Sequence, residues 1–190
     1  MAIRSVFICL SLLALSAAAP ARAAPERPLE ALAAPGRLLI IRHALAPGYG
    51  DPPEFRLGDC STQRNLDERG RDQARRLGDR LRAAGISRAK VFSSQWCRCL
   101  ETARLLDLGP VEPLSALNSF YQRRQQRGDR LSALRAFLAA LPADGPPTIL
   151  VTHQVTISAL TGSGTPSGGG SIFAVNGSGA PKLLGTIAPD

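Results

Sequence analysis

Two apolar segments that each end on a histidine constrain the fold of this chain more than any other feature. The segment RLLIIRH ends at His43 and the segment PTILVTH ends at His153, and these are the only two histidines in 190 residues. Uninterrupted runs of aliphatic residues are typical of strands that are buried on both faces of a parallel sheet. If the two strands are parallel neighbours, both imidazoles emerge at the carboxyl edge of the sheet, where open α/β folds bind ligands.

Helix-like and strand-like segments alternate along the rest of the chain. A helix is predicted over residues 67–84 and a short strand over residues 89–93, while Ser94 and Asp129 are expected to cap two further helices. Two more strands around a turn are predicted within residues 171–187. This alternation predicts an α/β fold, a three-layer αβα sandwich around a mostly parallel sheet in a single domain.

The N-terminus has the pattern of a secretory signal peptide over residues 1–23. Residues 6–19 are apolar, and residues 21–23 form a cleavage site with small residues at its first and third positions. The apolar stretch is shorter than the roughly 20 residues that a membrane span needs. We therefore expect an exported protein, periplasmic or secreted, without stable membrane insertion after cleavage. Residues 24–36 are predicted to be a flexible terminus and residues 37–190 the folded domain.

The charge of the chain favours an anionic ligand. The sequence has 23 basic and 15 acidic residues, and removal of Arg4 and Arg22 with the signal peptide leaves a net charge of +6. Aromatic residues make up only 5% of the sequence and do not alternate with basic ones, which argues against a nucleic-acid partner. We expect no nucleic acid among the partners.

Basic side chains join the two histidines at the predicted sheet edge. Arg42 precedes His43, and Arg98 lies near the start of a helix that follows a third strand. A guanidinium group matches two phosphate oxygens at once, and a helix N-terminus adds backbone donors. Two arginines and two histidines at one edge therefore predict a site for a multiply charged oxyanion.

Four motifs in this order resemble the histidine phosphatase superfamily, the phosphoglycerate-mutase-like phosphatases. The tripeptide RHA, which starts at Arg42, corresponds to Arg-His-Gly in the family. The segment LDERGRDQA corresponds to the family motif Leu-Thr-x-x-Gly-x-x-Gln-Ala. The segment SSQWCRCLETA corresponds to the family motif Ser-Ser-x-x-x-Arg-x-x-x-Thr-Ala. A strand that ends on a second histidine, His153, completes the set. The resemblance spans about residues 37–160 and is to the small single-domain members, which lack an inserted helical cap.

The resemblance implies a phosphomonoesterase that needs no metal and no other cofactor. His43 would attack phosphorus and form a phosphohistidine, while Arg42, Arg98 and His153 would hold the phosphoryl oxygens. Water would then release phosphate. The expected protein is a monomer that acts on a small-molecule phosphoester.

Two departures from the family pattern concern the phosphate pocket. Ala44 replaces the usual glycine, and Asn118 stands where many members place a glutamate proton donor. We expect both residues, together with Asn65 and Ser94, to neighbour the pocket. Because asparagine is no proton donor, a non-catalytic binder of phosphorylated envelope or extracellular ligands is the alternative function.

The loop after His43 contains the carboxyl groups that are candidates for the missing proton donor. Asp51 is the first candidate and Glu54 the second, because they flank two prolines that would stiffen the loop. We expect this loop, residues 44–63, and the glycine-rich residues 162–170 to border the pocket.

The cysteines suggest a disulfide, because an exported chain meets an oxidising compartment. Cys97 and Cys99 lie two residues apart on one predicted helix and point to different sides, so a bridge between them is not expected. In the family pattern, the residue that corresponds to position 99 is small and buried beside the core. The resemblance therefore predicts that Cys60 pairs with Cys97 in preference to Cys99. Three free thiols are the alternative, and the spacing is poor for a zinc site.

Overall fold

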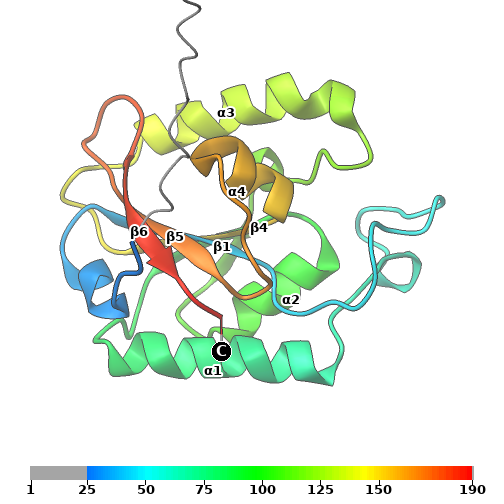
Figure 1. Ribbon diagram of the computed structural model, residues 1–190, viewed down its shortest axis with the longest axis horizontal. Coiled ribbons are helices and arrows are strands. Elements are labelled where there is room, and N and C mark those ends of the chain that lie inside the picture. Colours follow the sequence, from blue (N-terminus) through cyan, green and yellow to red (C-terminus); the bar gives the residue numbers. More distant parts are fainter. Residues whose placement is uncertain (1–24, 190) are drawn as a thin grey trace, which may run out of the picture.

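A computed structural model describes residues 25–189 of the chain, so the predicted signal peptide over residues 1–23 lies outside the described residues. Six strands form one sheet in the order β3-β2-β4-β1-β5-β6 (Figure 1). The strands are β1 (Arg37–Arg42), β2 (Lys90–Ser93), β3 (Val111–Pro113), β4 (Thr148–Thr152), β5 (Gly170–Ala174) and β6 (Lys182–Ile187). The first four are mutually parallel, whereas β5 runs antiparallel to both β1 and β6.

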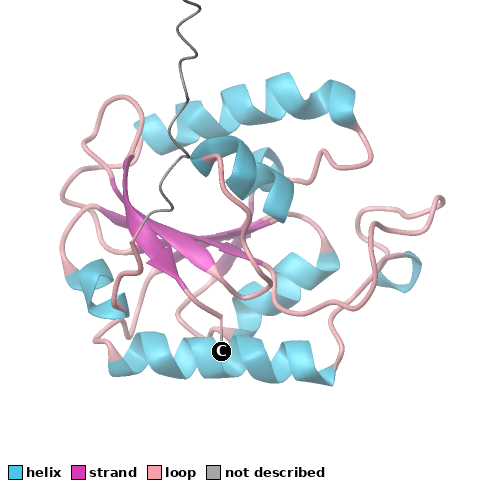
Figure 2. Cartoon of the chain, viewed as in Figure 1, coloured by secondary structure: helices cyan, strands magenta, loops and turns pink. Residues whose placement is uncertain are grey.

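Helices cover both faces of the sheet (Figures 1 and 2). The α-helices are α1 (Glu68–Ala83), α2 (Cys97–Leu105), α3 (Arg127–Ala139) and α4 (Gln154–Thr161), and the short 3₁₀ helices are η1 (Leu29–Ala33), η2 (Cys60–Thr62), η3 (Ser115–Leu117) and η4 (Arg124–Gln126). None of the helices within residues 25–189 has the length and apolar character of a membrane span. The predicted single-domain α/β sandwich with a mostly parallel sheet is confirmed.

Successive side chains of β1 point to opposite faces of the sheet, and the core is therefore divided into two layers. Leu39 and Ile41 pack with side chains of α1 and α2, whereas Leu38 and Ile40 pack with side chains of α3 and α4. All four side chains are fully buried. This burial on both faces explains why the strand reads as an unbroken aliphatic run.

The segment that precedes β1 is packed against the sheet, contrary to the prediction of a flexible terminus over residues 24–36. The backbone of residues 25–27 pairs with Thr186 of β6, and the 3₁₀ helix η1 follows. Leu29 and Leu32 of η1 join the core layer under α1 and α2. Burial of these two leucines stabilises the segment, although its alanine- and proline-rich composition suggested no packing against the domain.

The helix starts were predicted with mixed success. Asp67 caps α1 as expected, and its carboxylate accepts a hydrogen bond from the Gly70 amide at 2.8 Å. The predictions that Ser94 and Asp129 cap α2 and α3 are wrong. The N-cap of α2 is Trp96, and α3 already begins at Arg127, which places Asp129 in its first turn.

Candidate active site

The two histidines meet at the carboxyl edge of the sheet, as the strand pattern predicts. Strands β1 and β4 are parallel neighbours with Arg42 opposite Thr152, and a histidine follows each strand. The imidazole centroids of His43 and His153 lie 5.6 Å apart in a T-shaped arrangement, and both rings are buried. The topology therefore brings together two side chains that are far apart in the sequence.

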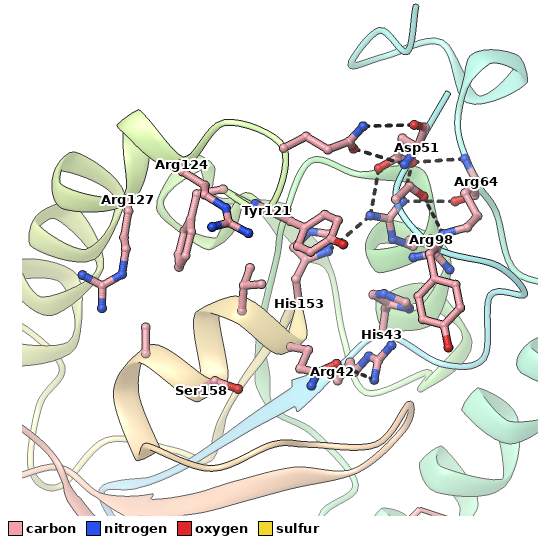
Figure 3. Close-up of a pocket in the computed structure, with 18 of the residues that line it drawn as sticks. Arg42, His43, Asp51, Arg64, Arg98, Tyr121, Arg124, Arg127, His153 and Ser158 are labelled. Atoms are coloured by element: carbon pink, nitrogen blue, oxygen red, sulfur yellow. Dashed lines mark hydrogen bonds and ion pairs between the residues drawn. The ribbon is translucent and has the colours of Figure 1, made fainter. Parts of the chain in front are cut away.

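A cavity of about 680 Å³ opens beside these histidines. Its walls come from the ends of β1 and β4, the loop after β1, α2, the segment before α3, and α4 (Figure 3). The charged and imidazole groups that line it are Arg42, His43, Asp51, Arg64, Arg98, Arg124, Arg127 and His153. The arginines are cationic at neutral pH, whereas the charge of each histidine depends on its surroundings.

The surroundings of His43 leave one imidazole nitrogen free to act as a nucleophile. Its Nδ1 lies 2.7 Å from the Ala44 carbonyl oxygen. A carbonyl oxygen can only accept, so Nδ1 carries the proton and Nε2 keeps its lone pair. Burial, and after it the Arg98 guanidinium, holds the pKa of His43 well below its usual value. The imidazole is therefore neutral at pH 7.

Arg42 is held beside His43 by acceptors from α4 and from the glycine-rich segment over residues 162–170. Its Nη1 donates to the Gln154 side chain and to the Thr165 carbonyl, each at 3.1 Å. Its buried Nε has no hydrogen-bond partner in the described part of the chain. The glycine-rich segment contributes Thr165 and the Gly168 amide, which donates to the Arg42 carbonyl at 3.2 Å. That segment therefore fixes the end of β1, and its glycines do not line the cavity.

Arg98 forms a buried, bidentate ion pair with Asp51. The two guanidinium nitrogens lie 2.7 and 3.1 Å from the two carboxylate oxygens, and both side chains are nearly inaccessible to solvent. Asp51 also accepts hydrogen bonds from the Trp96 indole at 3.0 Å and the Arg64 amide at 3.1 Å. The Nε of Arg98 is buried and, within residues 25–189, has no partner.

These contacts argue against both predicted proton donors. Although burial alone would raise it, the pKa of Asp51 is held below its usual value by the hydrogen bond and the charge of Arg98. The carboxylate is ionised and already accepts hydrogen bonds from Arg98, Trp96 and Arg64, so Asp51 does not serve as a general acid in this arrangement. Glu54 is exposed and does not line the cavity. The path of the loop, which the sequence did not disclose, places Asp51 against Arg98 and leaves Glu54 outside the cavity lining.

A third arginine, Arg64, lines the cavity and was not predicted. Its side chain donates to the carbonyl oxygens of Ala46 and Gly50, and its own carbonyl accepts from Arg98. Burial, and then repulsion from Arg98, lowers the pKa of Arg64 to about 10, which still leaves it charged at pH 7. Its neighbour Asn65, which we expected beside the pocket, donates its side-chain amide to the Cys60 and Gln63 carbonyls and does not line the cavity.

His153 is anchored from behind the cavity by Ser94 and Asn118. The Ser94 hydroxyl lies 2.8 Å from Nε2 of His153 and donates to the Asn118 side chain at 3.2 Å. On the other ring edge, Nη2 of Arg98 lies 3.5 Å from Nδ1. Burial, followed by the charge of Arg98, lowers the pKa of His153 well below its usual value. Ser94 and Asn118 are thus buried supports of this imidazole and do not line the cavity.

Ala44, the departure from glycine, places its methyl group away from the cavity. The residue is fully buried in a small apolar cluster with Ala46, Leu66 and Ala74, and it does not line the cavity. Its amide donates to the Thr102 hydroxyl at 3.0 Å. The extra methyl group therefore fills core space and leaves the room for a ligand unchanged.

The remaining motif residues hold the loop after His43 in place. The Gln73 side chain accepts from the Leu45 amide at 2.9 Å and donates to the Ser167 carbonyl at 3.1 Å, so it joins two loops. A Cβ atom at Gly70 would collide with the Leu45 carbonyl oxygen. These contacts explain why the LDERGRDQA segment has glycine and glutamine at those positions.

A disulfide joins the same loop to the helix that carries Arg98. Cys60 and Cys97 are bonded, which was the preferred pairing, and Cys99 is a free, buried thiol. Burial raises the pKa of the Cys99 thiol to about 12, so it stays protonated. Among residues 25–189, no three His, Cys, Asp or Glu side chains are grouped so that they could hold a metal ion.

Comparisons with known proteins identify the fold. Residues 38–121 match the model of the histidine phosphatase superfamily, branch 1. The protein histidine phosphatase SixA complexed with tungstate is 20% identical, with a TM-score of 0.58 over 80% of this chain and 97% of that one. Phosphoglycerate mutase from Thermus thermophilus is 19% identical, with a TM-score of 0.57 over 81% of this chain and 99% of that one. No curated protein matches the sequence.

Proposed function

We propose that this chain, which has the fold of branch 1 of the histidine phosphatase superfamily, is a phosphomonoesterase that uses His43 as its nucleophile and needs no metal. The observation that carries the proposal is the tautomer of His43. Its Nδ1 proton is held by the Ala44 carbonyl, its ring is neutral, and Nε2 is left with a lone pair beside the arginine-lined cavity. A neutral imidazole held in this way is prepared for attack on phosphorus.

The arginines supply the electrostatic part of the reaction. The partnerless Nε–H groups of Arg42 and Arg98 are donors that an oxygen of a bound phosphoryl group would satisfy. Nε2 of His43 attacks phosphorus, the bond to the leaving oxygen breaks, and the electron pair departs with that oxygen. Water then attacks the phosphohistidine, which returns inorganic phosphate and neutral imidazole. The guanidinium groups stabilise the charge that moves through both transition states.

The cavity favours leaving groups that depart without protonation. Asp51 is the only carboxyl group among the described residues that line the cavity, and it is ionised against Arg98. Esters of acidic alcohols, such as aryl phosphates, need no general acid because the departing oxyanion is stable. We therefore expect aryl phosphates to be hydrolysed much faster than alkyl phosphates.

The lack of a proton donor among the described residues that line the cavity also favours a second candidate function, a non-catalytic binder of phosphorylated ligands. Such a protein would use the cationic cavity and would need no proton donor. Both candidates predict binding of inorganic phosphate, so binding alone does not separate them.

Turnover in the presence of a chelator separates the two candidates. The enzyme releases p-nitrophenol from p-nitrophenyl phosphate in excess EDTA, and His43→Ala abolishes release while it keeps the melting temperature near that of the native chain. Quenching with SDS at alkaline pH during turnover of a ³²P-labelled aryl phosphate should trap a base-stable, acid-labile phosphoprotein that His43→Ala lacks. Phosphate binding without release by the native chain would establish the binder.

We also propose that the protein is exported. The Cys60–Cys97 bond supports this proposal, because structural disulfides persist in oxidising compartments and are rare in reducing ones. N-terminal sequencing of the protein from a secreting host tests it, with a mature chain that begins after Ala23 as the expected result. An intact Met1 in the recovered protein would contradict export by this route.

A further inference from the structure

The cavity is much larger than a phosphoryl group requires. Its volume of about 680 Å³ lies within the range of roughly 300–1,000 Å³ that is typical of pockets for drug-sized ligands. The histidines, Arg42 and Arg98 occupy one side, and Arg124 and Arg127 lie on the opposite side (Figure 3). The space between the two sides is where a leaving group would lie.

Arg124 and Arg127 are cations without a counter-charge. Their side chains make no hydrogen bond or ion pair with any residue between 25 and 189. Some surface arginines of the chain are paired with carboxylates, for example Arg71 with Glu101 at 2.7 Å and Arg82 with Asp79 at 2.7 Å, but among the described residues only Arg124 and Arg127 combine the lack of a partner with a place at the far side of the cavity. The two arginines at the cavity wall are therefore available to a ligand.

The position of this pair has no explanation in helix stability. Arg124 belongs to η4 and Arg127 is the first residue of α3, so both lie near the positive end of the α3 dipole, where a cation is unfavourable. Asp129 in the first turn of α3 supplies a negative charge at this end of the helix, but it forms no ion pair with Arg124 or Arg127. An anion bound between Arg124 and Arg127 would offset the repulsion at the start of α3.

Aromatic side chains line the same cavity, and Tyr121 lies between the two sides (Figure 3). Tyr49 is 99% exposed and Tyr121 is 51% exposed, and both line the cavity together with Phe120. Val155 and Ala159 of α4 add apolar wall to the cavity. An exposed tyrosine at a cavity mouth offers a flat apolar face to a ring or a hydrocarbon segment of a ligand.

We infer that Arg124 and Arg127 form an outer anion subsite, and that the substrates are phosphomonoesters whose leaving group carries a second anionic group beyond an apolar segment. The inference rests on the proposed function, in which the first phosphoryl group lies at His43. It deepens that function by assigning the far side of the cavity to the leaving group.

Paired substrates that differ only in the second charge test this inference. One is 4-(2-carboxyethyl)phenyl phosphate and the other is its carboxamide, in which the two methylene groups insulate the phenol from the change. We expect the native chain to have a roughly tenfold lower KM for the carboxylate, as two exposed ion pairs would give. The preference should vanish in the double variant Arg124→Gln, Arg127→Gln.

The matched control is Arg135→Gln, which removes a positive charge from an exposed position of α3 that does not line the cavity. This variant should keep the preference. Equal KM values for the two substrates in the native chain, or a preference that survives in the double variant, would overturn the subsite.

A second measurement keeps the subsite testable if the chain hydrolyses neither ester. Titration calorimetry with 4-(2-carboxyethyl)benzylphosphonate and its carboxamide reports binding without turnover, and the same tenfold preference and the same loss in the double variant are expected. Absence of turnover would refute the phosphatase, whereas equal affinities for the two phosphonates would refute the subsite.

Discussion

Replacing Asp51 by asparagine perturbs the buried pair on which the position of Arg98 depends. The carboxylate accepts from both terminal nitrogens of Arg98, from the Trp96 indole and from the Arg64 amide. Asparagine has nearly the same size, but it keeps only one accepting oxygen and carries no charge. Its amide nitrogen would face donors of Arg98 or Trp96, and the guanidinium would remain buried without a counter-ion.

The magnitude follows from the burial of both partners. Removal of one member of a buried ion pair costs about 3–5 kcal/mol, and the oxygen that asparagine retains places this change near the lower end, at about 3 kcal/mol. The direction in which this contribution to stability changes with pH follows from the lowered pKa of Asp51. The stability that the ionised carboxylate contributes is fully present above its unfolded pKa of about 3.9 and is lost as the pH falls through the lower, folded value.

Urea denaturation of the native chain and Asp51→Asn measures this difference. We expect a gap of about 3 kcal/mol at pH 7 that narrows as the pH falls below about 4. Asp59→Asn is the matched control from the same loop, since its pair with Arg56 is exposed and should contribute little. A gap at pH 7 no larger than that of the control would refute the reasoning.

Kinetics distinguish a positioning role for Asp51 from general acid catalysis. A displaced Arg98 weakens phosphoryl stabilisation for every ester, so Asp51→Asn should slow p-nitrophenyl phosphate and an alkyl phosphate by similar factors, on the order of 10²-fold. A variant that slows the alkyl ester alone would show that Asp51 donates the proton to the leaving group, and our assignment would fail.

Three further predictions concern the rest of the site. NMR titration of the two histidines should show no protonation of either folded ring near pH 6.5, and stability should fall below that pH because only the unfolded imidazoles take up protons there. Reduction of the Cys60–Cys97 bond, whose cysteines are 37 residues apart, should lower the free energy of unfolding by up to about 4 kcal/mol in a urea titration under reducing conditions. Ala44→Gly should change aryl phosphate turnover by less than about twofold and cost roughly 1 kcal/mol of stability, because the methyl group packs in the core.

Local patterns in the sequence were sufficient to predict the strands and the convergence of their ends. The aliphatic runs before His43 and His153 have the form that burial on both faces requires, and parallel pairing then places both rings at one edge. The preferred Cys60–Cys97 pairing was also confirmed. In each case a short segment, or its match to a family motif, contains most of the information that decides the outcome.

Contacts that depend on the path of a loop could not be predicted in this way. Asp51 and Arg98 are 47 residues apart, and nothing in the sequence near either residue indicates that they pair. Arg64 was missed for the same reason, because the loop turns this arginine toward the cavity while the side chain of the expected neighbour Asn65 bonds to backbone carbonyls. Leu29 illustrates a related error, since a composition typical of a flexible terminus concealed an apolar residue that the core buries.

The charges around His43 explain why a buried carboxylate belongs in an anion site. Arg42, Arg64 and Arg98 carry three positive charges, and the neutral imidazoles add none. Without Asp51, three guanidinium groups would face a phosphomonoester that carries at most about two negative charges at neutral pH. The excess would hold the phosphate product as firmly as the substrate, and uniform binding of this kind does not accelerate the chemical step. With Asp51 ionised, one of the three positive charges is neutralised, so the local charge matches the dianion, and the same carboxylate fixes the guanidinium of Arg98 on the cavity wall.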